Sequence, residues 1–82
     1  MKTTVTSKPE DIKFSFVNTS SLQIVSSEEA KEAKIESIIR KEYESIVTET
    51  VVIKTSKNTY VQAVFEKNQT SGDITNVGEE II

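Results

Sequence analysis

The side chains with the most chemical potential in this sequence are the glutamates between residues 28 and 36. Glu28 and Glu32 are separated by one helical turn, as are Glu32 and Glu36, so each pair would share a helix face. Paired carboxylates can carry out general acid–base chemistry or bind a hard cation. A catalytic pair has to be buried, and a Ca²⁺ or Mg²⁺ site needs further oxygen ligands at set spacing. Because these glutamates fall on the polar side of their predicted helix, we interpret them as a solvated face.

The residue types that most enzymes depend on are missing. The chain has no cysteine and no histidine, which removes the usual nucleophiles, the general base of neutral pH and the soft metal ligands. Serines such as Ser20 and Ser56 have no histidine to activate them, and two glycines leave no phosphate-cradling loop. The sequence therefore predicts a protein that is not an enzyme and has no catalytic residue, cofactor or metal.

A nucleic-acid surface is the alternative reading of the second half of the chain. Lys54, Lys57 and Lys67 lie near Tyr60, and an aromatic ring beside lysines on a sheet can stack a base. The net charge of −3 and the single arginine oppose this reading, because affinity for phosphates needs several cationic contacts. We keep it as an alternative hypothesis of weak nucleic-acid binding.

Protein binding is the leading hypothesis. Alternation over residues 47–67 places Val52, Tyr60 and Val64 on the face of a sheet opposite Val51 and Phe65. That second face is partly apolar and would be open to a partner. The sequence thus predicts a protein-binding module with a candidate interface at Val52, Tyr60 and Val64.

Length and composition set the class of protein. Eighty-two residues suit one domain, and a chain of this size buries only about 60% of its unfolded surface. Without cysteine no disulfide can compensate, so we expect a homodimer.

The first residues contain no apolar stretch, and no apolar run is long enough to span a membrane. We expect a cytoplasmic protein. Its preference for Lys over Arg suggests a bacterial or phage source, and binding or inhibition of a host protein is one concrete version of the function.

The expected elements begin with a flexible arm over residues 1–11, followed by one domain over residues 12–82. Alternating apolar residues predict a first hairpin, with strands over 12–17 and 22–25. Ser26 and Glu29 have the spacing of a capping box. An apolar stripe then predicts a helix over residues 27–45. The residues of this stripe are Ala30, Ala33, Ile35, Ile38, Ile39, Tyr43 and Ile46.

A second hairpin follows the predicted helix. Its strands are expected over residues 47–55 and 59–67, which are rich in β-branched and aromatic side chains. Residues 74–82 are a candidate C-terminal edge strand. The predicted fold is α+β, with two layers, one helix packed on a mainly antiparallel sheet, and the order ββαββ.

Overall fold

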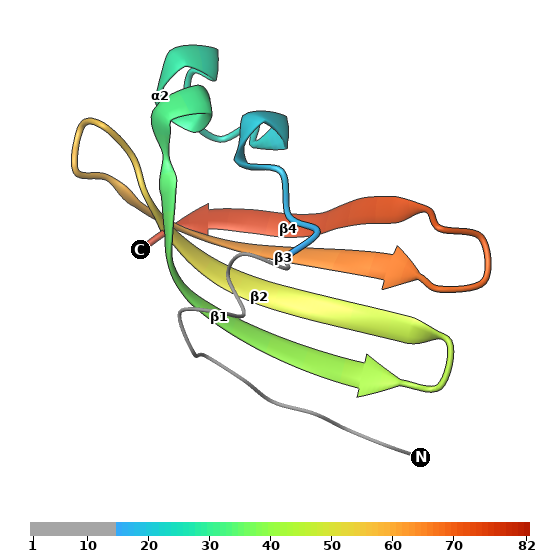
Figure 1. Cartoon of the computed structure of the whole chain (residues 1–82). Coiled ribbons are helices and arrows are strands. Elements are labelled where there is room, and N and C mark those ends of the chain that lie inside the picture. Colours follow the sequence, from blue (N-terminus) through green and yellow to red (C-terminus); the bar gives the residue numbers. More distant parts are fainter. Residues whose placement is uncertain (1–14) are drawn as a thin grey trace.

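The structure is a computed structural model that describes residues 15–82. Four strands form one antiparallel sheet in the spatial order β1-β2-β3-β4, which is also their order in the chain, so each connection is a hairpin (Figure 1). Two helical turns precede the sheet, a 3₁₀ turn η1 and a short α-helix α2. The bounds are Thr19–Ser21 (η1), Ser27–Glu32 (α2), Lys34–Tyr43 (β1), Ile46–Lys54 (β2), Tyr60–Asn68 (β3) and Ile74–Ile81 (β4).

The sheet has one covered face and one open face. Burial alternates along β2 and β3, as expected for strands whose side chains point to opposite faces. We call the face with the buried side chains the inner face and the opposite one the outer face. Residues 15–33, the cover segment, lie over the inner face (Figure 1). The core joins the cover segment to the sheet and consists of Leu22, Ala30, Ile38, Val51, Ile53, Ala63 and Phe65.

The prediction of one long helix is wrong. The Ser26 half of the capping box is confirmed, since the Ser26 hydroxyl accepts the Glu29 N–H at 3.3 Å, whereas the Glu29 carboxylate accepts from the Ser26 hydroxyl and not from the Ser26 N–H. However, α2 ends at Glu32, Ala33 is already extended, and the chain continues as β1. The predicted α+β fold is therefore wrong as well, because the structure is mostly sheet.

A β-bulge explains why the strand resembled a helix. Ile35 pairs with Ile53 and Ser37 with Val52, so Glu36 is an extra residue in β1. A bulge lengthens the spacing between inner-face residues from two to three. Ile35 and Ile38 therefore both reach the core although they are three apart, which is also a helical spacing. Pairing along β2 then outweighs the local helix propensity.

The first predicted hairpin is also wrong where the structure describes it. Residues 15–17 and 22–25 form no strand, and η1 occupies the predicted turn. Phe16, Leu22 and Val25 instead pack on the inner face. The remaining part of that hairpin, and the arm predicted over residues 1–11, lie outside the described residues.

The second hairpin and the antiparallel sheet are confirmed, as β2 and β3 pair along their whole length. The candidate C-terminal strand exists as β4, which pairs with β3 at the edge of the sheet. A second bulge lies in β4, where Val77 is the extra residue between Asn76 and Gly78. Both bulges are thus in edge strands, as is common in natural sheets.

Candidate functional site

The structure places the three predicted interface residues together on the outer face. Val52 lies on β2, whereas Val64 and Tyr60 lie on β3, all at positions that alternate with buried inner-face residues. Thr50 pairs with both Val64 and Ile39, so these three side chains form a row across the sheet. Ile39 belongs to this surface and was missed, because it was assigned to the buried stripe of a helix.

This outer surface is open as far as the described chain shows. Tyr60 is 41% exposed and Ile39 is 42% exposed. The two helical turns both lie on the other side of the sheet (Figure 1). The surface therefore combines β-branched and aromatic side chains with access from solvent, which suits a contact with another polypeptide.

The candidate nucleic-acid residues are divided between different surfaces. Lys54 Nζ lies 5.7 Å from the centre of the Tyr60 ring, so these two residues form a cation–π pair on the outer face. Lys57 lies in the turn between β2 and β3, with Nζ 4.0 Å from a Glu29 carboxylate oxygen. Lys67 lies on the inner side, where it lines a cavity with Phe16. The structure brings together only two of the four predicted residues.

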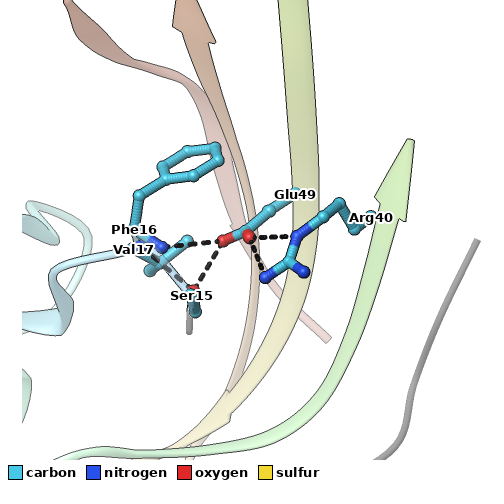
Figure 2. Close-up of polar contacts among 5 residues, drawn as sticks. All are labelled: Ser15, Phe16, Val17, Arg40 and Glu49. Atoms are coloured by element: carbon cyan, nitrogen blue, oxygen red, sulfur yellow. Dashed lines mark hydrogen bonds and ion pairs between the residues drawn. The ribbon is translucent and has the colours of Figure 1, made fainter. Parts of the chain in front are cut away.

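A buried carboxylate that sequence reasoning missed lies on the inner face. Glu49 is fully buried on the central strand β2. Its Oε2 accepts a hydrogen bond from Nε of Arg40 and forms an ion pair with Nη2 of the same residue, each at 2.7 Å (Figure 2). Its Oε1 accepts hydrogen bonds from the Ser15 hydroxyl at 2.5 Å and from the Phe16 N–H at 3.2 Å. Its position could have been found from the alternation, because Glu49 has the same parity as Val47 and Val51.

This Glu49 cluster attaches the cover segment to the sheet. A buried charge is tolerated only when it is paired and hydrogen-bonded, and both oxygens of Glu49 have partners. Arg40 supplies the opposite charge from β1, and residues 15 and 16 supply hydrogen bonds from the cover segment. The cluster adjoins a cavity of about 360 Å³ that Lys67 also lines.

A second carboxylate attaches the cover segment to the edge strand β4. Glu79 on β4 accepts the backbone N–H of Gln23 at 3.0 Å and that of Ile24 at 3.1 Å. The Asn76 amide donates to the other oxygen of Glu79 at 2.7 Å and so orients the carboxylate. Two acidic side chains, on β2 and β4, thus serve as acceptors for the backbone of the cover segment.

The glutamates between residues 28 and 36 that were considered as a catalytic or metal-binding pair form no site. Glu28, Glu32 and Glu36 are all exposed. Across residues 15–82, no group of three or more aspartates, glutamates, histidines or cysteines is placed to hold a metal ion.

The remaining exposed apolar surface lies along β4, the strand predicted as a candidate C-terminal edge strand. Among residues 15–82, five of the seven large hydrophobic residues that are exposed lie on this strand or directly beside it: Ile24, Ile74, Val77, Ile81 and Ile82. Val77 and Ile81 are more than half exposed, at 58% and 54%. The outer face and this edge are the two surfaces that the described residues leave open to a partner.

Comparison with known proteins found no matching family model, no matching curated protein and no matching solved structure. Within residues 15–82 no helix has the length and apolar character needed to cross a membrane. The case for function therefore depends on the surfaces described above.

Proposed function

We propose that this chain is a small, non-enzymatic protein-binding module that forms a homodimer through the outer face of its sheet. The observation that carries the proposal is the open row of Ile39, Thr50 and Val64, which Val52 and Tyr60 extend. The inner face has a cover of apolar side chains, whereas the outer face has none among the described residues. Burying the outer face against a partner would add apolar contacts that so small a domain otherwise lacks.

The charges on the outer face support a second copy as the partner. The β1–β2 half bears Lys41 and Lys54, with Lys34 at its end, whereas the β3–β4 half bears Glu66 and Glu80. A two-fold axis parallel to the strands and between two stacked sheets places β1 over the partner's β4 and β2 over its β3. The basic half then faces the acidic half in both directions, while the apolar row is buried between the sheets.

Sedimentation at micromolar concentration tests this proposal, with an expected mass of about twice 9.2 kDa. Val64→Glu places an unpaired charge in the centre of the interface and should give a monomer that still melts cooperatively. Val77→Glu is the matched control, because the same change then lies at the β4 edge and should leave the dimer intact. A wild-type protein that is monomeric throughout this range would refute the homodimer.

The cellular location and the source that we propose for this protein come from its sequence. We place the protein in the cytoplasm of a bacterial cell or of a phage-infected one, where it would bind a host protein and inhibit it by occupying its surface. The support is compositional, namely the preference for Lys over Arg. Site-specific crosslinking from the β4 edge, which the proposed dimer leaves open, inside the source cell, followed by identification of the crosslinked protein, tests this assignment.

Weak binding of single-stranded nucleic acid is the second candidate, and the Lys54–Tyr60 pair favours it. A lysine held beside an exposed ring provides one phosphate contact and one stacking platform. The experiment is fluorescence anisotropy of a labelled DNA single strand at low ionic strength, where electrostatic attraction is strongest. Lys54→Glu should abolish binding, and Lys67→Glu should have little effect because Lys67 lies on the inner side. No binding by the wild-type protein at low salt would eliminate this candidate.

A further inference from the structure

The free edge of β4 has the main-chain geometry of a strand that can pair with another chain. Within residues 15–82, β4 has only β3 as a neighbour in the sheet. The Ile82 N–H donates to the Tyr60 carbonyl at 3.0 Å, so by the alternation of an antiparallel ladder the main-chain groups of Glu80 and Gly78 also point toward β3. Those of Glu79 and Ile81 therefore point away from the sheet, and no described residue hydrogen-bonds to them.

Gly78 leaves a notch beside this edge. A side chain added at Gly78 would meet nothing within 4 Å. A shallow cavity of about 250 Å³ lies there, lined by Gln62, Val64, Gly78, Glu79 and Glu80. Because the main chain of Gly78 points toward β3, a partner residue opposite it would form a non-hydrogen-bonded pair, in which side chains approach most closely. A large side chain on that residue could therefore lie over the vacant position.

The side chains along β4 determine the chemistry of a suitable partner. Natural edge strands are commonly protected by lysine, proline or a β-bulge. β4 has no lysine or proline, and its bulge at Val77 precedes Glu79 and Ile81, whose main-chain groups are the open ones. Apart from Thr75, its exposed side chains are apolar or acidic: Val77 and Ile81 are more than half exposed, and Glu80 is exposed, as is Asp73 just before the strand. No basic residue follows Lys67 in the sequence. This composition repels a second acidic β4 and attracts a basic strand.

We infer that the edge of β4 binds an extended, basic segment of a partner protein, which adds a fifth strand to the sheet. The segment pairs with the outward main-chain groups of Glu79 and Ile81, carries an aromatic or large aliphatic side chain opposite Gly78, and carries a lysine or arginine opposite Glu80. This inference rests on the proposed function of protein binding, and it assigns the partner to a different surface from the outer-face dimer.

The first test uses a synthetic peptide in which lysine and valine alternate and phenylalanine replaces the central lysine. The labelled peptide should bind the full-length chain, and binding should protect the amides of Glu79 and Ile81 from hydrogen exchange. The same peptide N-methylated over its central residues keeps its composition and charge but cannot pair as a strand, and it should bind at least about tenfold more weakly. A peptide with glutamate in place of lysine should also fail. Equal binding of the N-methylated peptide, or no binding of the parent at low salt, would overturn the inference.

Two substitutions then locate the binding site. Gly78→Val fills the notch and should weaken binding of the parent peptide about tenfold, whereas Glu80→Lys should weaken it about five- to tenfold through charge reversal. Gly78→Val also adds an apolar side chain to the outer face, so dimerisation there should be retained or strengthened. The two proposals therefore fail separately. Unchanged peptide affinity in Gly78→Val would refute binding at β4, and a monomeric wild-type protein that still binds the peptide would refute only the homodimer.

Discussion

The two faces of the sheet differ most clearly at two neighbouring residues of the same type. Ile38 is fully buried on the inner face, whereas Ile39 is 42% exposed on the outer face. Both are β-branched, and both lie in β1, so intrinsic propensity does not distinguish them. The difference comes from the cover segment, which lies over one face and is attached to the sheet by Glu49 and Glu79. One face is thereby used for stability, and the other is left available for binding.

The largest expected effect is the loss of the Glu49 cluster. Glu49→Ala removes the ion pair with Arg40 and the acceptor of the Phe16 N–H. Removing one member of a buried ion pair costs about 3–5 kcal/mol, a large part of the stability of a small domain. Urea denaturation should show this loss, and Glu80→Ala, which removes an exposed glutamate, should change stability by less than about 0.5 kcal/mol. Similar stabilities for the two variants would show that Glu49 does not hold the cover segment.

The pair Ile38→Ala and Ile39→Ala tests the assignment of the two faces directly. Ile38→Ala creates a cavity in the core and should cost about 2–5 kcal/mol. Ile39→Ala should cost less than about 1 kcal/mol in the monomer, because its side chain is already partly in water. Thermal and urea unfolding at low protein concentration measure both. A larger loss of stability for Ile39→Ala than for Ile38→Ala would mean that Ile39 is a core residue, as the predicted helix requires.

An intermediate effect is expected at the second attachment point. Glu79→Ala removes the acceptor of the Gln23 and Ile24 amides at one end of the cover segment. We expect a loss of about 1–2 kcal/mol, since hydrogen bonds to a charged acceptor are stronger than neutral ones but this site is partly exposed. Hydrogen exchange should show faster exchange of these two amides while the β2 and β3 amides stay protected. Uniform acceleration over the whole sheet would mean that the cover segment does not open on its own.

The smallest expected effect is at the helix cap. Ser26→Ala removes the hydroxyl that accepts the Glu29 N–H and should cost about 1 kcal/mol. Because α2 contributes only Ala30 to the core, the loss should be confined to the cover segment. Ser27→Ala, one residue later and exposed, is the matched control. Equal melting temperatures for Ser26→Ala and wild type would show that the cap does not stabilise the cover segment.

The sequence by itself determined the features that depend on local chemistry. Ser26 and Glu29 specify where α2 begins, and alternation over residues 46–68 specifies the central hairpin, because a period of two is unambiguous where no bulge interrupts it. The same alternation placed Val52, Tyr60 and Val64 on one face. These are the residues from which protein binding was predicted.

Only the tertiary structure decided where α2 ends and what the next ten residues become. The bulge at Glu36 gives β1 a helix-like spacing, so the sequence pattern could not separate the two conformations, and pairing with β2 settled the outcome. Alternation already indicates the sheet face of Glu49, Lys54 and Lys67. The partners of Glu49 and the open edge of β4 depend on how the strands and the cover segment are placed in space. The physical reason is that sheet contacts join residues far apart in the chain, and no local spacing records which strand will lie beside which.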